Sequence, residues 1–171
     1  MTNIVKANLS HAKILSEIGK QTFIESHGMS APEKDITNYI KSKFTKVVFE
    51  AELEDSNNIF HMITYNEKPI GYSKISYNST QENISFKNIT KLERLYILQE
   101  YHHLKLGFEL FKFNVELSKK QNQAGLWLYV WVENQKAINF YNKVGFKIIG
   151  SYDFQISETH SNPNHQMLLV Y

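Results

Sequence analysis

A chain of 171 residues, of which 42% are hydrophobic, can bury the core of one domain. It has no cysteine, which excludes disulfides, cysteine-ligated metals and a cysteine acyl-enzyme. The net charge of +2 gives no sign of a nucleic-acid-binding surface. No stretch approaches the roughly 20 apolar residues of a membrane span. We therefore expect a single cytoplasmic domain over residues 1–171, with neither nucleic acid nor membrane as a partner.

The first half of the chain predicts a strand, two helices and a hairpin. Residues 4–8 have the character of a strand, and apolar residues at helical spacing follow in 14–23 and in 36–44. Two runs rich in β-branched and aromatic residues, 59–65 and 70–77, flank a short turn and predict an antiparallel hairpin. A cluster of acidic residues before this hairpin is expected to be a solvated helix face, with attraction of a cationic substrate as the alternative. The cluster consists of Glu50, Glu52, Glu54 and Asp55.

In the second half, strands and helices alternate. The predicted elements are strand 92–98, helix 106–121, strand 126–132, helix 135–144, strand 146–154 and a final strand 166–171. A strand–helix–strand unit of this length implies a right-handed parallel crossover. Residues 126–132 are apolar at both parities, as in a strand buried on both faces. The predicted fold is therefore mixed α/β.

The junction between the strand ending near Leu98 and the helix beginning near Gly107 is a natural anion site. The first turn of a helix leaves backbone N–H groups without internal partners, and a glycine lets a phosphate approach the backbone closely. By itself a single glycine in such a turn is often only conformational. The strand before it adds a second feature. In a regular strand the apolar residues alternate, but here Leu92 is at an even position while Leu95 and Ile97 are at odd positions. This slip predicts a β-bulge, and bulges often lie beside active sites.

Two segments of this second half carry a resemblance to a known family. Residues 92–97 (LERLYI), followed by 100–107 (EYHHLKLG), resemble the central motif of the GNAT acyltransferase superfamily, whose loop reads Q/R-x-x-G-x-G/A. Residues 134–146 (NQKAINFYNKVGF) resemble that family's N-x-x-A-I-x-F-Y-x-K-x-G-F segment almost residue for residue. Residues 127–134 and the tail from Asp153 onward look most like the bacterial polyamine acetyltransferases of the PaiA type.

The resemblance implies a mostly antiparallel sheet with one parallel crossover and helices on both faces. It also implies an enzyme that moves the acetyl group of acetyl-coenzyme A directly to a primary amine, with a polyamine or another small amine as the best guess. Two alternatives remain open: a non-catalytic coenzyme A-binding or regulatory module, and a protein or peptide N-acetyltransferase. We also leave open whether the chain works as a monomer or a homodimer.

The same resemblance assigns the cofactor to the bulged strand, the loop and the second motif. The implied cofactor-binding residues are Leu95, Tyr96, Ile97, His102, His103, Leu104, Lys105, Leu106, Gly107, Asn134, Ala137 and Tyr141. The loop departs from the family pattern, with His102 at the Gln or Arg position and Lys105 at the first glycine. A lysine adopts a positive φ only at a cost, so the loop either takes another path or accepts strain. The Lys105 ammonium could compensate by lying near a phosphate.

The resemblance makes Tyr141 the general acid, because a phenol with a pKa near 10 suits protonation of a departing thiolate. The alternative is an ordinary core tyrosine. Glu93 is the nearest candidate base for the amine, through a water molecule, with a salt bridge to Arg94 or a solvated position as the alternative. Asn134 is expected to cap the helix that follows it.

The histidines predict no metal site. His102, His103, His160 and His165 have no acidic or cysteine partners at metal-binding spacing. Residues 162–164 (Asn-Pro-Asn) are interpreted as a plain turn. Glu25 and His27, at the end of the first predicted helix, are candidates to line the acceptor site.

Overall fold

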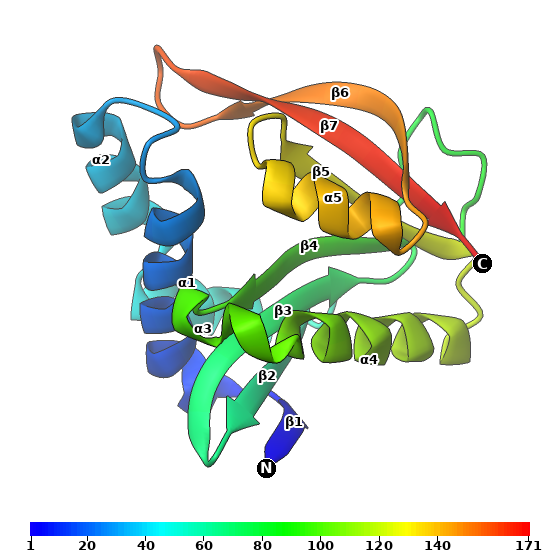
Figure 1. The fold of residues 1–171 in the computed structure, drawn as a ribbon, viewed down its shortest axis with the longest axis horizontal. Coiled ribbons are helices and arrows are strands. Elements are labelled where there is room, and N and C mark those ends of the chain that lie inside the picture. Colours follow the sequence, from blue (N-terminus) through cyan, green and yellow to red (C-terminus); the bar gives the residue numbers. More distant parts are fainter.

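The computed structural model describes all of residues 1–171 and contains one seven-stranded sheet in the order β1-β2-β3-β4-β5-β7-β6 (Figure 1). The strands are β1 (Thr2–Lys6), β2 (Ile59–Tyr65), β3 (Lys68–Ser76), β4 (Thr90–Ile97), β5 (Gly125–Trp131), β6 (Lys147–Gln155) and β7 (Ser161–Val170). Every neighbouring pair is antiparallel except β4 and β5, which the helix α4 connects. The predicted mixed fold with one parallel crossover is confirmed.

Helices cover both faces of the sheet. They are α1 (Ala12–His27), α2 (Glu33–Lys43), α3 (Lys46–Glu54), α4 (Leu106–Lys120) and α5 (Gln135–Lys143), with short 3-10 turns at Leu9–His11 and Gln99–Leu104. Alternation along β2 explains the layers, since Phe60 and Met62 pack into the cluster that contains the buried residues of α1 to α3. The intervening His61 contacts Phe113 of α4 with ring centroids 4.8 Å apart, and Ile63 joins the cluster under α4.

Helix α5 lies over the second half of the sheet. Its buried Ile138 packs with the inward side chains of β5, which include Leu126 and Leu128, and with Phe146 after the helix. Trp127 points to the opposite side of β5 and is fully buried against Ile84 and Ile89. The prediction that this strand is buried on both faces is confirmed.

Two local predictions were wrong. Helix α3 is a separate third helix, capped by the Thr45 side chain, which accepts a hydrogen bond from Val48 N–H at 3.3 Å. It buries only Phe49 completely, too little apolar periodicity to stand out in the sequence. Residues 162–164 are not a turn but the start of β7, where the buried Asn162 donates to Ser30 Oγ at 2.8 Å.

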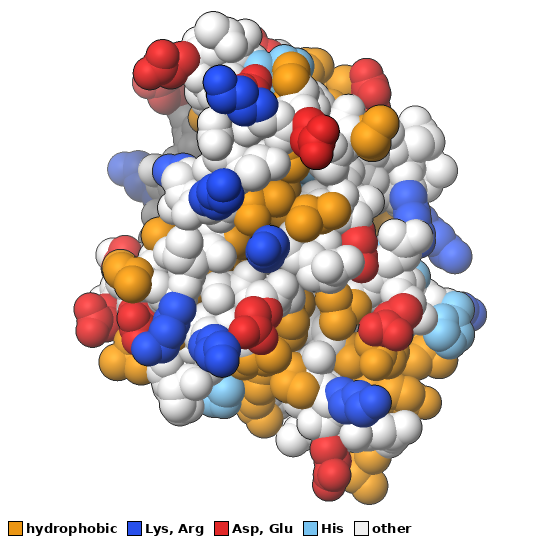
Figure 2. All heavy atoms as spheres, turned by 90° about the vertical axis from the view of Figure 1, so that its left-hand side faces the viewer, with side chains coloured by type: hydrophobic (Ala, Val, Ile, Leu, Met, Phe, Trp, Pro, Cys, Tyr) orange, Lys and Arg blue, Asp and Glu red, His pale blue; other side chains and the backbone are white.

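Figure 2 shows the side of the molecule on the left of Figure 1, where positive, negative and apolar side chains are interspersed. None of the helices combines the length and the hydropathy that crossing a membrane requires.

Candidate active site

The parallel pairing of β4 and β5 is short. Only Thr90 and Lys91 of β4 are in register with β5, while β5 pairs with β7 along its whole length. Beyond this point the two strands diverge and leave a cleft of ≈ 1690 Å³. Residues of α4 and α5 line it, together with residues of α1, α2 and β7. Small-molecule pockets usually hold roughly 300–1,000 Å³, so this cleft has room for two ligands.

Strand β4 forms one wall of the cleft and contains the predicted bulge. Leu92 pairs with Ile75 and Arg94 pairs with Lys74, so Glu93 is left without a partner. A bulge bends its strand and increases its twist, which fits the separation of β4 from β5. From Leu95 to Ile97, β4 pairs with β3 alone. Peptide groups on its other edge face the cleft, where they could hydrogen-bond an extended ligand.

The loop after β4 brings a helix start to the cleft. Lys105 ends the 3-10 turn and precedes α4 with φ 57° and ψ 19°, the left-handed conformation that glycine adopts without cost. Of the two predicted outcomes, the loop therefore accepts strain, of about 1 kcal/mol. It keeps the course that a glycine would give it, so that Lys105 and Gly107 both line the cleft.

Gly107 is not required by packing within the protein. Its φ lies outside the left-handed range, and an added Cβ would meet only Ile97 Cγ1, at an ordinary 3.6 Å. A side chain here would instead project beside the first turn of α4, where free N–H groups favour an anion. Neither backbone conformation nor packing within the protein therefore requires a glycine at this position.

His102 hydrogen-bonds the loop to both β4 and α5. Its Nε2 lies 2.8 Å from the Ile97 carbonyl oxygen and its Nδ1 lies 2.7 Å from Lys136 Nζ. Because a carbonyl only accepts and an ammonium only donates, Nε2 carries the proton and Nδ1 accepts. The ring links the end of β4 to the first turn of α5. Lys136 was missed by the sequence analysis, because no local pattern shows that it reaches a loop 34 residues away.

Helix α5 supplies the second predicted group of residues. The Asn134 side chain accepts a hydrogen bond from Ala137 N–H at 3.2 Å, which confirms the predicted cap. Tyr141 lines the cleft with its ring edge-on to Phe146, at a centroid distance of 5.3 Å. Burial, and secondarily Tyr96, raise the pKa of Tyr141 above its ordinary value, so its phenol stays protonated at neutral pH.

Most of the predicted cofactor-binding residues meet at this one cleft. Those that line it are Leu95, Tyr96, Ile97, His102, Lys105, Gly107, Asn134, Ala137 and Tyr141. Three others do not. The side chains of Leu104 and Leu106 pack into the hydrophobic cluster beneath the loop, and His103 is exposed to solvent. No group of three or more His, Cys, Asp or Glu side chains is arranged to hold a metal ion.

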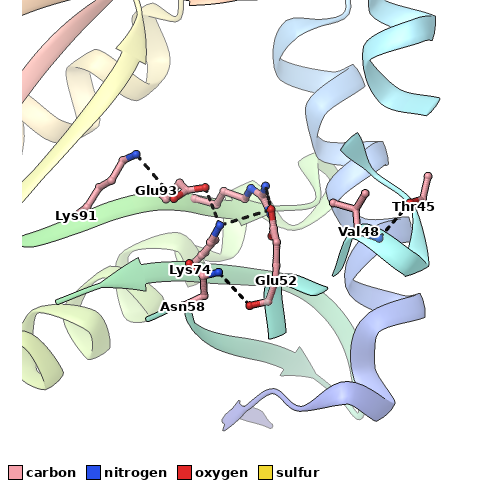
Figure 3. A network of polar contacts seen from close by, with 8 residues as sticks. Thr45, Val48, Glu52, Asn58, Lys74, Lys91 and Glu93 are labelled. Carbon is pink, nitrogen blue, oxygen red and sulfur yellow. Dashed lines mark hydrogen bonds and ion pairs between the residues drawn. The ribbon is translucent and has the colours of Figure 1, made fainter. Parts of the chain in front are cut away.

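A charged network crosses the bulge (Figure 3). Arg94 is held by both carboxylate oxygens of Glu52, with Nη1–Oε2 and Nη2–Oε1 distances of 2.7 and 2.9 Å. Lys74 Nζ lies 2.8 Å from Glu93 Oε1 and 3.5 Å from Glu52 Oε1. The prediction of a solvated acidic helix face is therefore wrong for Glu52, whose side chain is only 20% exposed.

The alternative prediction for Glu93, a salt bridge to Arg94, is also wrong. Glu93 pairs instead with Lys74 and, at 3.8 Å, with Lys91. Burial acts to raise the pKa of the Glu93 carboxyl, but the attraction of Lys74, Lys91 and Arg94 outweighs it and holds the pKa below its ordinary value. Glu93 is thus a carboxylate at neutral pH, beside the cleft that it lines.

The part of the cleft formed by α1 and α2 is different in character. Glu25 and His27, named from the sequence, both line it. Burial lowers the pKa of His27 to about 4, so the imidazole is uncharged at neutral pH. Aromatic residues that the sequence analysis did not single out lie beside it, among them Trp131 and Tyr39. Since they come from distant segments, only the fold brings them together.

Known proteins share this architecture. The chain is 25% identical over 149 residues to a spermidine N(1)-acetyltransferase of Thermoplasma acidophilum, covering 85% of this chain and 88% of that protein. It is 24% identical over 141 residues to an uncharacterized N-acetyltransferase of Lactobacillus delbrueckii subsp. lactis, covering 82% of each. The crystal structure of the PaiA N-acetyltransferase from Thermoplasma acidophilum in complex with coenzyme A superimposes with a TM-score of 0.79, at 23% identity, over 100% of this chain and 99% of the other.

A family model decides the assignment. The model of the acetyltransferase (GNAT) family matches residues 22–146, a range that includes the bulged strand, the loop and both motifs. The match confirms the predicted enzyme class, with acetyl-coenzyme A as cosubstrate. This chain belongs to the GNAT family of acetyltransferases.

Proposed function

We propose that residues 1–171 act as one domain that transfers the acetyl group of acetyl-coenzyme A directly to a primary amine, with a polyamine as the best candidate acceptor. The observation that carries this proposal is the cleft between the diverging strands. On one wall it has the free edge of β4, and at one end it has the N-terminal turns of α4 and α5. A thioester and an amine can meet there without a covalent enzyme intermediate.

The end of the cleft near α4 and α5 fits a polyphosphorylated cofactor. Six lysines line the cleft, and they come from β4, from the loop before α4, from α4 and from α5. They are Lys91, Lys105, Lys112, Lys119, Lys136 and Lys143. Lys91 pairs with Glu93, but no carboxylate pairs with Lys105 or Lys136. Lys136 also lies in the first turn of α5, where the helix dipole disfavours a cation unless an anion is near.

In the proposed reaction, the amine nitrogen attacks the thioester carbonyl carbon and the carbon–sulfur bond breaks. The free edge of β4 would hold the extended arm of the cofactor and place N–H groups near the carbonyl oxygen, as it becomes negative. Tyr141 would give its phenolic proton to the departing thiolate sulfur. The amine would lose its proton to water near Glu93, whose carboxylate is a weak base because Lys74 holds its pKa low.

The choice of a polyamine rests on the relative that is named a spermidine N(1)-acetyltransferase. The lining of the cleft is consistent with this choice, because Glu25 lines it without an ion pair and would attract a cationic acceptor. The test is thiol release from acetyl-coenzyme A with a panel of spermidine, spermine, single amino acids and a peptide with a free N-terminus. We expect release with the polyamines. Release only with the peptide would assign a peptide N-acetyltransferase, and release with none would leave a non-catalytic module.

The exposed Lys105 provides a separate prediction about the cofactor loop. Replacing Lys105 by glycine removes the left-handed strain but also the ammonium group, and we expect coenzyme A to bind roughly 5-fold more weakly in calorimetry. Lys105→Ala is the matched control, since it removes the charge and keeps the strain, and it should weaken binding equally. Tighter binding by Lys105→Gly than by the wild type would show that the lysine does not contact a phosphate.

A further inference from the structure

One end of the cleft is walled by aromatic rings from four elements. The ring of His27 lies 5.7 Å from Trp131 and 4.9 Å from Phe23, measured between centroids. Phe23 stacks on Tyr39 at 5.0 Å, and Tyr39 meets Phe154 edge-on at 6.0 Å. We call these five residues the aromatic wall, and all of them line the cleft. Phe23 is buried behind the others, which are half-buried and keep surface on the cleft side.

The elements that carry the aromatic wall contribute no lysine or arginine to the lining of the cleft. None of the six lysines that line the cleft comes from α1, α2 or β7. Arg94 reaches the cleft, but its guanidinium is occupied by both oxygens of Glu52. His27 is uncharged at neutral pH, as described above. The cations that line the cleft thus come from β4, α4, α5 and the loop before α4. The one that follows Trp131 most closely in the chain, Lys136, lies 2.7 Å from His102 Nδ1.

The free negative charge near the wall is small. Glu52 is committed to Arg94 and Glu93 to Lys74. Glu25, two residues from His27, takes part in no ion pair, and its Oε2 accepts a hydrogen bond from Gln99 N–H at 2.9 Å. Glu133, just after Trp131, also lines the cleft and takes part in no ion pair. Two carboxylates and several aromatic faces therefore remain to receive the part of the acceptor that does not react. Aromatic faces attract ammonium groups within about 6 Å and also bury methylene chains.

We infer that the aromatic wall binds the non-reacting part of the acceptor and that this part carries a second ammonium group, held over the face of Trp131 or of Tyr39, with Glu25 and Glu133 as the unpaired carboxylates of this region. The inference rests on the proposed acetylation of an amine. It assigns the acceptor class as a diamine or longer polyamine whose methylenes lie on the rings. It also assigns the recognition to cation–π contacts, since the carboxylates next to the bulge are already paired.

The test compares spermidine with nonylamine, which has the same chain length and lacks the second and third nitrogen atoms. Trp131→Leu is expected to raise the KM of spermidine about 10-fold and to leave the KM of nonylamine nearly unchanged. The KM of acetyl-coenzyme A should stay the same in this variant. Trp131→Phe, which keeps an aromatic face, should recover most of the loss.

An equal rise of KM for both amines would show that the aromatic wall recognises only an apolar chain. No rise of KM for either amine would show that the wall is not part of the acceptor site. Tyr39→Leu and Tyr39→Phe repeat the comparison on α2, in case Trp131→Leu unfolds. Calorimetry of spermidine with the protein saturated with coenzyme A separates this inference from the proposed function. Binding that Trp131→Leu weakens would support the wall even without turnover, whereas absence of binding would overturn it.

Discussion

Replacing Tyr141 by phenylalanine is expected to lower kcat roughly 100-fold or more, because positioned general acids contribute about 10²–10⁴-fold to rate. The ring and its edge contact with Phe146 remain, so only the proton donor is lost. Steady-state thiol release measures the rate, and calorimetry measures coenzyme A binding, which should change by less than about twofold. Unchanged kcat would make Tyr141 a core tyrosine without a catalytic role.

The environment of Tyr141 adds a pH signature. Burial and Tyr96 raise its pKa above the ordinary value of 10.0, and a raised pKa keeps the phenol in its proton-donating form to higher pH. The wild-type kcat should therefore show no alkaline fall from this residue below about pH 10. Tyr152→Phe is the matched control, because Tyr152 is 45% exposed and lies outside the cleft. Its kcat should equal that of the wild type.

Replacing Glu52 by glutamine is expected to lower the free energy of unfolding by about 3 kcal/mol. The change leaves the guanidinium of Arg94, only 13% exposed, without its paired carboxylate. Urea denaturation measures the loss, which corresponds to a fall in Tm of roughly 6–12 °C for a chain of this size. Because Arg94 follows the bulge directly, we also expect slower turnover.

Two further variants control this result. Glu54→Gln changes an exposed carboxylate on the same helix and should leave stability within about 0.5 kcal/mol of the wild type. The double variant Glu52→Gln with Arg94→Met removes both charges and should be more stable than Glu52→Gln alone, since no charge is left buried without a partner. If Glu52→Gln were as stable as Glu54→Gln, the ion pair would not support the bulge.

Local patterns predicted the features that depend on neighbours in sequence. The slip between Leu92 and Leu95 indicated the bulge, and Asn134 before a helical repeat indicated a cap, because both arise within a few residues. Lys105 left two outcomes open. Which one holds depends on whether the 3-10 turn and α4 on either side, with the His102 hydrogen bonds, outweigh about 1 kcal/mol of strain.

Features that join distant segments could not be predicted in this way. Glu52 and Arg94 are 42 residues apart. In the sequence Glu52 is one of four similar acidic residues, and only the position of α3 against β4 distinguishes it from the others. The aromatic wall combines α1 and α2 with the ends of β5 and β6, and each of its residues alone has the pattern of an ordinary core residue. Its charge environment depends on which lysines the fold brings to the cleft.

Direct transfer within the cleft is most directly tested by the initial-velocity pattern, with acetyl-coenzyme A and spermidine varied together. Both ligands must occupy the cleft at once, so the double-reciprocal lines should intersect. Incubation with radiolabelled acetyl-coenzyme A alone should leave the protein unlabelled. Parallel lines together with a labelled protein would show a covalent acetyl-enzyme and would contradict the proposed mechanism.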